Sequence, residues 1–199
     1  MLDLPFSQAA ENNRGPILDQ LRLILKDART VLEIGAGTGQ HASFFAAHMP
    51  WLSWQPSEYP AAVELLLPRC RQADLGNLAK PLALDICTGP WPEDWPDALY
   101  TANTLHIVAT DAVESLFDTC AERAAANSQL LVYGPFNYAD RYTSESNARF
   151  DEWLKARDAR SGIRDIEWVD GLASAAGYTL EQDIAMPANN RLLQWRRRA

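Results

Sequence analysis

Three glycines separated by single residues stand in the run Val31-Leu-Glu-Ile-Gly-Ala-Gly-Thr-Gly-Gln-His41. Val31, Leu32 and Ile34 predict a short buried strand, and the residues from Gln40 onward predict a helix with one apolar face. Glycine suits the turn between them, because a side chain there would keep the backbone away from a bound ligand. A strand, a glycine turn and a helix in this order form an element that cradles a nucleotide.

The spacing of the glycines distinguishes between cofactors. A dinucleotide site is typical of Gly-x-Gly-x-x-Gly, whereas this turn is Gly35-x-Gly37-x-Gly39, with Glu33 close before it at the end of the strand. A carboxylate there repels a pyrophosphate and favours a cation. S-adenosylmethionine carries a sulfonium and an ammonium group, and the turn resembles motif I of the class I S-adenosylmethionine-dependent methyltransferases. The alternative is a glycine-rich turn in an ordinary α/β protein.

Polar residues also stand at the ends of the next three predicted strands. Glu58 follows the glycine turn by roughly 20 residues, a spacing suited to accepting hydrogen bonds from ribose hydroxyls. Asp85 is placed to accept from an adenine amino group, with the Ile86 N–H meeting a ring nitrogen, and Asn103 to line the methionine portion. Ligands of open α/β sheets bind beyond the carboxyl ends of the strands, so we expect one shared site. Taken alone, each residue is also a common helix-cap or turn residue.

The rest of the chain predicts helices that alternate with strands. Helices are expected to begin at Asn13–Pro16, at Pro60, with an end or kink at Pro68, and at a capping box Asp111–Glu114. A further helix is expected to bury Phe150, Trp153 and Leu154, and another to cover Asp170–Ala176. Strands are expected at Leu52–Ser57, Pro81–Ile86, Ala98–Asn103, Leu130–Tyr133, Tyr178–Ala185 and Arg191–Arg197. This alternation indicates a doubly wound parallel sheet that closes with an antiparallel hairpin. We therefore expect an α/β protein with a Rossmann-like, seven-stranded, mostly parallel sheet, the class I methyltransferase fold, as a single domain over residues 1–199.

Composition narrows the function classes. The 199 residues are 47% hydrophobic and 22% charged, which is typical of a globular domain, and the net charge of −8 argues against nucleic acid as a partner. No apolar run approaches the roughly 20 residues of a membrane span. The first residues lack the basic and apolar regions of a signal peptide, and Cys70, Cys87 and Cys120 are isolated, so we expect a reduced, cytoplasmic protein. Because no Cys/His cluster has metal-ligand spacing, we expect no metal.

Short motifs spread over nearly the whole chain carry a closer resemblance. They are Glu11-Asn-Asn-Arg-Gly-Pro-Ile-Leu18, Gly37-Thr-Gly-Gln-His41, Trp54-Gln-Pro-Ser57, Ala102-Asn-Thr-Leu-His106, Tyr133-Gly-Pro135, Thr143-Ser-x-Ser-Asn147 and Pro187-Ala-Asn-Asn190. Together they resemble the methyltransferase-like 26 family, an uncharacterised group of class I methyltransferases whose methyl acceptor is not established. The chain departs from that pattern at Asn12, where a basic residue is expected.

Methyl transfer is an in-line displacement, so positioning supplies most of the catalysis. His106, just past the fourth predicted strand, is the best-placed catalytic base, because imidazole titrates near neutrality. The alternative is a histidine at a helix start that is hydrogen-bonded to the backbone. His41 lies in the first turn of the helix after the glycines, and we expect it to pack or orient.

The methyl acceptor is predicted by what the chain lacks. The segment after the fourth strand is Ala-Asn-Thr-Leu-His, without the Asn-Pro-Pro-Tyr or Asp-Pro-Pro-Tyr signature of enzymes that methylate base amines. We therefore expect a small-molecule acceptor first and a protein side chain second. Candidate acceptor-binding residues are Arg14, Tyr138, Tyr142, Asn189 and Asn190, and the polar stretch Asn137–Asn147 is expected to be a mobile lid.

Two other functions compete with the enzyme. The absence of a decisive catalytic residue favours a non-catalytic module that binds S-adenosylmethionine or S-adenosylhomocysteine, or a partner subunit on the same fold. A nicotinamide-dependent reductase is the weaker alternative, because the glycine spacing and Glu33 speak against it.

Overall fold

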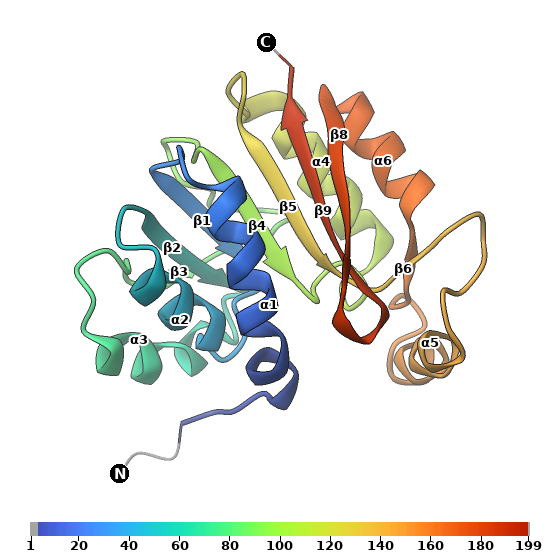
Figure 1. Ribbon diagram of the computed structural model, residues 1–199, viewed down its shortest axis with the longest axis horizontal. Helices are drawn as coiled ribbons and strands as arrows, with labels where there is room; N and C mark the ends of the chain where they lie inside the picture. The colour runs from blue at the N-terminus through green and yellow to red at the C-terminus, as the bar shows by residue number, and fades with distance from the viewer. Residues whose placement is uncertain (1–3, 199) are drawn as a thin grey trace. The chain divides into compact units, whose positions relative to one another are not determined.

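The computed structural model describes residues 4–198 (Figure 1), so residues 1–3 of the N-terminal segment considered above, and residue 199, lie outside the described residues. The strands are β1 (Thr30–Ile34), β2 (Ser53–Glu58), β3 (Leu82–Ala83), β4 (Ala98–Ala102), β5 (Gln129–Gly134), β6 (Phe136–Asn137), β7 (Arg164–Asp165), β8 (Tyr178–Met186) and β9 (Asn190–Arg197). The helices are α1 (Gln8–Ile24), α2 (Gln40–His48), α3 (Leu67–Ala73), α4 (Thr110–Arg123), α5 (Glu145–Arg157) and α6 (Ile166–Ala175), with 3-10 turns η1 (Val63–Leu65) and η2 (Pro187–Asn189).

Seven strands form one mostly parallel sheet in the order β3-β2-β1-β4-β5-β9-β8, and β6 pairs with β7 separately. β1 runs parallel to β2 and β4, and β2 parallel to β3, whereas β9 is antiparallel to both β5 and β8. The expected fold class and the C-terminal hairpin are confirmed. The chain also divides into two compact units, residues 1–101 and 102–199, which are described separately below. The single-domain expectation stays a prediction.

In the first unit, the two faces of β1 and β2 have different neighbours. Val31 pairs with Trp54, and the Trp54 ring lies 5.5 Å from the ring of Phe45 on α2. Leu32 pairs with Gln55, one residue further along each strand. Because side chains alternate along a strand, Leu32 and Gln55 face away from α2. The core of this unit therefore lies between α2 and one face of the sheet (Figure 1).

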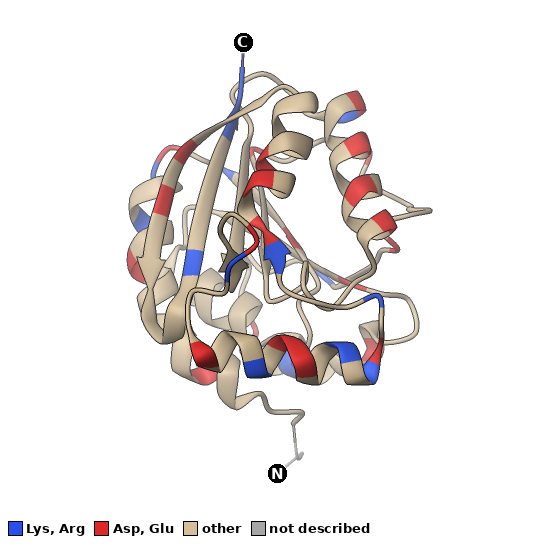
Figure 2. Cartoon of the chain, turned by 90° about the vertical axis from the view of Figure 1, so that its right-hand side faces the viewer, with Lys and Arg blue, Asp and Glu red and all other residues tan. Residues whose placement is uncertain are grey.

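In the second unit, α6 packs along the β8–β9 hairpin. The fully buried Trp195 on β9 donates its indole N–H to the Asp170 carboxylate on α6 at 2.8 Å. Gly177, with φ 83°, stands just past the end of α6 as the sequence predicts, because glycine adopts this left-handed conformation without strain. Acidic and basic residues are interspersed along α5 (Figure 2).

Two expected helix starts and one expected helix cap are wrong. α1 begins at Gln8, with the Ser7 hydroxyl capping Ala10 N–H at 3.3 Å, so Pro16 lies inside the helix and not near its start. The apolar stripe begins only at Ile17 and therefore hid the polar first turns. No helix starts at Pro60, and Pro68 lies in the first turn of α3, where a missing N–H is harmless.

The capping box at Asp111 is the third error. α4 is capped by Ala109, and the Asp111 side chain accepts only from the next residue, Ala112 N–H, at 2.9 Å. On α5, Trp153 is 50% exposed, contrary to its expected inward position. The buried face of that helix carries Asn147, Asp151 and Leu154, because buried hydrogen bonds there satisfy polar side chains that the apolar pattern does not anticipate.

β3 is shorter than expected, because the chain turns back directly after it. Asp85 C=O accepts Gly89 N–H at 2.7 Å and closes a tight turn. No helix among residues 4–198 is long and apolar enough to cross a bilayer.

Candidate functional site

The glycine turn follows the carboxyl end of β1. Gly35, Gly37 and Gly39 have φ values of 70°, 57° and 72°, which only glycine adopts readily. A Cβ atom added at Gly37 would meet no atom within 4 Å, so this position faces open space. At Gly37 the backbone is therefore not covered by protein atoms, and the expectation that a ligand lies there stays a prediction.

Glu58, the last residue of β2, lies against this turn. Its carboxylate accepts Gly37 N–H at 2.7 Å through Oε2 and Tyr59 N–H at 2.8 Å through Oε1. Each carboxylate oxygen has two lone pairs, so both oxygens keep acceptor capacity for a ligand hydroxyl. The structure thus brings Glu58 and the glycine turn together.

Glu33 is buried on the α2 side of the sheet, with 2% of its surface exposed. Its Oε2 accepts the Trp54 indole N–H at 2.8 Å. Burial, together with the nearby Glu58 charge and against the lowering effect of the Trp54 hydrogen bond, raises the pKa of Glu33 to about 8. This pKa favours the protonated form of Glu33 in the ligand-free protein, and its role toward a cationic ligand stays a prediction.

Asp85 and Ile86 occupy the turn after β3. Asp85 Oδ1 accepts Cys87 N–H at 2.8 Å, so this carboxylate shapes its own turn. Asp85 Oδ2 and the Ile86 N–H have no hydrogen-bond partner within residues 4–198. One acceptor and one donor of this turn therefore remain available to a ligand.

Sequence reasoning missed a network that ties the start of the chain to the glycine turn. Gln40 Oε1 accepts Ser7 N–H at 2.5 Å and the Thr38 hydroxyl at 3.0 Å. Arg69 donates to Thr38 C=O at 3.0 Å and to Pro5 C=O at 2.6 Å. The position of Gln40 directly after the last glycine was the available signal. This network fixes the backbone that the ligand would approach.

The sequence also singles out His41 and Arg14 in the first unit. His41 Nε2 lies 2.7 Å from Asn13 Oδ1, and its ring stacks 5.0 Å from Phe45. Burial lowers the pKa of His41 to about 4, so the ring is neutral and packs, as expected from the sequence. Arg14 pairs with Glu11 at 2.5 Å and lies 4.5 Å over the Phe44 ring.

In the second unit, His106 and Asn103 gather around Gly134. A Cβ atom on Gly134 would lie 3.5 Å from His106 Nδ1 and 3.8 Å from Asn103 Oδ1. Asn103 has φ 60° and donates its N–H to Tyr133 C=O at 2.8 Å, which fixes the end of β4. Burial, with the positive charge of Arg164, lowers the pKa of His106 to about 4. His106 is therefore neutral at physiological pH, as a base must be, but weakly basic.

Tyr138 is held by two residues that the sequence did not single out. Its hydroxyl donates to Asp183 Oδ2 at 2.7 Å, and Arg191 Nε donates to Asp183 Oδ1 at 2.6 Å. Burial and the Asp183 carboxylate raise the pKa of Tyr138. Asp183 pairs with Leu193 across the β8–β9 hairpin, and Arg191 lies two residues from Leu193, so Asp183 and Arg191 are diagonal neighbours that only the strand register reveals.

A hydrogen bond also joins the stretch Asn137–Asn147 to the hairpin turn. Asn147 Nδ2 donates to Asn189 C=O at 3.2 Å, which joins α5 to the hairpin turn. Asn189 has φ 57°, and Asn190 Nδ2 donates to Pro187 C=O at 3.1 Å, so both asparagines shape the turn. Their role toward an acceptor, and the mobility of the stretch, stay predictions.

The buried Asp151 on α5 accepts a hydrogen bond from Tyr142 in this stretch. Asp151→Ala is expected to lower the free energy of unfolding by about 3 kcal/mol. Its side chain, 2% exposed, accepts the Tyr142 hydroxyl at 2.7 Å, Ile163 N–H at 2.6 Å and Lys155 Nζ at 2.6 Å. Truncation leaves the buried Ile163 N–H without an acceptor. Urea unfolding measures the loss, with the exposed neighbour Glu152→Ala as the control.

The pH dependence gives a second check on Asp151. Its three partners hold the pKa of this carboxyl below its ordinary 3.8, so the ionised form stabilises the fold. That stability is present above the unfolded value and is lost as the pH falls through the folded value. The gap between the wild type and Asp151→Ala should therefore narrow below about pH 4. A gap that is constant down to pH 2 would contradict the assigned role.

The fold defined above is that of methyltransferases of known structure. It is shared by an O-methyltransferase family protein from Burkholderia thailandensis (TM-score 0.81, 18% identity, 93% of this chain and 56% of that one). It is shared by mitomycin 7-O-methyltransferase MmcR (TM-score 0.81, 20% identity, 95% and 54%). A Planctomyces limnophilus O-methyltransferase in complex with apigenin has TM-score 0.82, 18% identity, and coverage of 95% and 58%. The present chain spans little more than half the length of each.

The family itself is identified by sequence. Residues 4–197 match the family described as protein of unknown function DUF938, and the chain belongs to that family. The family description assigns no activity.

Proposed function

We propose that this chain is an S-adenosylmethionine-dependent methyltransferase that acts on a small-molecule acceptor. The observation that carries the proposal is Gly37: its φ is 57°, a Cβ there would enter open space, and its N–H is held by Glu58 at 2.7 Å. The Glu58 carboxylate beside the turn disfavours a pyrophosphate and suits a cationic nucleoside. The O-methyltransferase fold of the structural neighbours supports the proposal, and so does the resemblance to the methyltransferase-like 26 family.

Different residues are proposed to hold different parts of the cofactor. When bound, S-adenosylmethionine supplies a methyl group on a sulfonium, activated for displacement. The backbone of Gly35, Gly37 and Gly39 provides the surface for it, and Glu58 accepts from its ribose. Glu33 ionises to balance its ammonium group. Adenine is assigned to Asp85 and Ile86, and the methionine portion to Asn103.

His106 is proposed as the base that takes the acceptor's proton. Its ring is neutral and lies beside Gly134, which has no side chain to cover Nδ1. With a pKa of about 4, the imidazole suits an acceptor whose own proton is acidic. The residues proposed to border the acceptor are Arg14, Tyr138, Tyr142, Asn189 and Asn190.

Calorimetric titration of the full chain tests the proposal. S-adenosylmethionine and S-adenosylhomocysteine should both bind, and NADH should not, because the turn lacks the dinucleotide spacing. Glu58→Ala should weaken both adenosyl ligands, and Glu58→Gln should weaken them less, because an amide oxygen still accepts. Binding of NADH alone would replace the proposal with the reductase.

The weak basicity of His106 also favours the second function, a non-catalytic S-adenosylmethionine-binding module or partner subunit. Incubation of the protein with methyl-labelled cofactor and cell lysate separates the two. A labelled product that disappears with His106→Gln supports the enzyme. Cofactor binding with no labelled product in any fraction supports the module.

The proposal also covers the domain organisation, the cellular location and the partners of the protein. We expect one domain over residues 1–199 in the cytoplasm, where Cys70, Cys87 and Cys120, unpaired in the structure, stay reduced. We also expect it to act without a metal, a nucleic acid or a membrane.

A further inference from the structure

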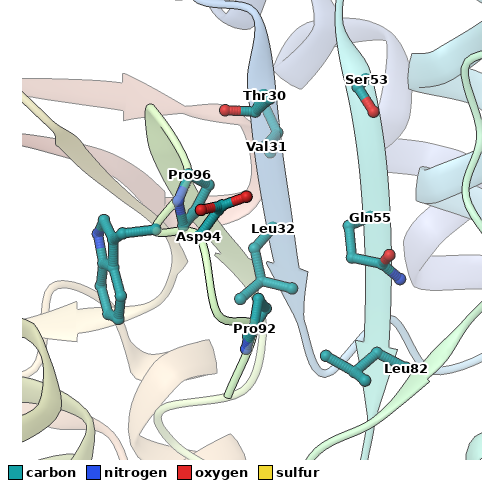
Figure 3. Close-up of a pocket in the computed structure, with 10 residues that line it drawn as sticks. Thr30, Val31, Leu32, Ser53, Gln55, Leu82, Pro92, Asp94 and Pro96 are labelled. Carbon is teal, nitrogen blue, oxygen red and sulfur yellow. The ribbon is translucent and has the colours of Figure 1, made fainter. Parts of the chain in front are cut away.

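A cavity of about 430 Å³ opens on the face of β1 and β2 that points away from α2 (Figure 3). Leu32 and Gln55 form its floor, and they are register partners on that face. Small-molecule sites have volumes of roughly 300 to 1,000 Å³, so the cavity is large enough for a compact ligand. All its lining residues belong to the first unit.

The wall of the cavity is a stiff loop. Residues 86–97 join the turn after β3 to β4 and contain no helix. Trp91 and Trp95 stack at 5.8 Å with 25° between their planes, and Pro92 and Pro96 line the cavity beside Trp95. Proline fixes its own φ, and stacked indoles resist reorientation, so the wall is formed before any ligand arrives.

The polar groups that the cavity offers are acceptors. Gln55 Nε2 already donates to Lys80 C=O at 2.8 Å and to Pro56 C=O at 2.9 Å. Gln55 Oε1 and the exposed Asp94 carboxylate have no hydrogen-bond or ion-pair partner among the described residues. A ligand that satisfies both must donate hydrogen bonds, and the Asp94 charge favours a cation.

The cavity is separate from the glycine turn. It begins at Thr30 and Ser53, the first residues of β1 and β2, and extends to Leu82 on β3. Leu82 pairs with Ser57, which pairs with Ile34 at the carboxyl end of β1. None of Gly35, Gly37 and Gly39 lines the cavity, so the cavity and the glycine turn are different surfaces.

We propose that this cavity is a second ligand site, for a small organic amine with an apolar body. The body lies on Leu32 and Leu82 against Pro92, and the ammonium group donates to the Asp94 carboxylate and to Gln55 Oε1. The protein then holds two ligands, one at the glycine turn and one in this cavity, and the second site is independent of the proposed function at the first.

Amide NMR titration of the full chain with three probes of one shape tests this site. The probes are 2-phenylethylammonium, 2-phenylethanol and 3-phenylpropanoate, which differ in the charge of the head group. The cation should bind tightest and the anion weakest, and the amide signals that shift should be those of Leu32, Gln55, Asp94 and Trp95, with Gly37 unchanged.

Matched variants test the contributions of the Asp94 charge and of the free volume of the cavity to binding. Asp94→Asn should weaken the cation about three- to fivefold, the size of an exposed charge pair, and leave the alcohol unchanged. Asp27→Asn, an exposed acid in the turn after α1, removes the same charge elsewhere and should change nothing. Ser53→Phe places a ring in the cavity and should abolish binding of all three probes.

Three results would overturn the site. They are equal affinity for the three probes, undiminished cation binding in both Asp94→Asn and Ser53→Phe, and amide shifts confined to the glycine turn or to residues 102–198. If Ser53→Phe does not fold, the isosteric change at exposed Asp94 still decides. S-adenosylmethionine titration of Asp94→Asn should match the wild type, which keeps failure here distinct from failure of the proposed function.

Discussion

Gly37→Val is expected to lower the affinity for S-adenosylmethionine by at least about 100-fold, or about 2.7 kcal/mol, while the protein stays folded. The new side chain meets no protein atom within 4 Å, so it enters the space kept for the ligand. Valine at φ 57° strains the backbone by about 1–2 kcal/mol, so Tm should fall by only a few degrees. Calorimetric titration and thermal unfolding by circular dichroism measure the two effects.

Two glycine controls separate the ligand from the strain. Gly177→Val carries similar strain at φ 83°, but it lies in the second unit, after α6. Gly76→Val also points a side chain into open space, without the left-handed backbone. Both should bind the cofactor normally. Normal binding by Gly37→Val would contradict the site, and equal losses in Gly37→Val and Gly177→Val would assign the effect to the backbone.

The glycine turn could be predicted because its requirement is local. Three left-handed residues in five positions demand glycine, and the apolar residues before them predict a buried strand. The sheet could be predicted for a similar reason, since strands alternating with helices have few ways to pack. The hairpin of β8 and β9 and the stop at Gly177 follow the same local rules.

Helix starts were less predictable, because a polar first turn leaves no apolar stripe. Ser7 caps α1 through one hydroxyl contact, ten residues before the stripe begins at Ile17. Pro68 shows a second limit. A proline is equally compatible with the first turn of a helix and with its end, and only the neighbouring elements decide between them.

Long-range polar contacts were not predictable, because they depend on strand register and burial. Tyr138 could be nominated for an acceptor pocket from its place in the chain, but its partner Asp183 lies 45 residues away. The protonation of Glu33 has the same origin: only the packing of Trp54 and α2 over the sheet removes that carboxyl from water. These contacts change what the residues can do, so they matter more to mechanism than the helix bounds.

Cofactor binding is expected to release a proton from Glu33 and to strengthen as the pH rises to about 8. Free Glu33 is protonated below that pH, because burial raises its pKa to about 8 and Glu58 repels its charge. The ligand's ammonium group favours the ionised form, so it lowers the pKa in the complex and expels the proton. If that pKa falls to about 6, affinity should rise about 25-fold between pH 6 and pH 8, as part of a total rise of about 100-fold. Calorimetry in buffers of different ionisation enthalpy counts the released proton.

Glu33→Gln is the matched control, because an amide oxygen still accepts the Trp54 N–H but cannot ionise. The ligand's own amino group titrates near pH 8 in both proteins and cancels in the comparison. The variant should therefore lose the excess pH dependence and bind more weakly at pH 8. The pH dependence of folding stability is an independent test. The folded protein keeps a proton at Glu33 that the unfolded chain loses above pH 4.5, so the free energy of unfolding of the wild type should fall between pH 4.5 and about 8. Glu33→Gln should show a smaller fall, whereas identical stability profiles would mean that Glu33 is already ionised in the folded protein.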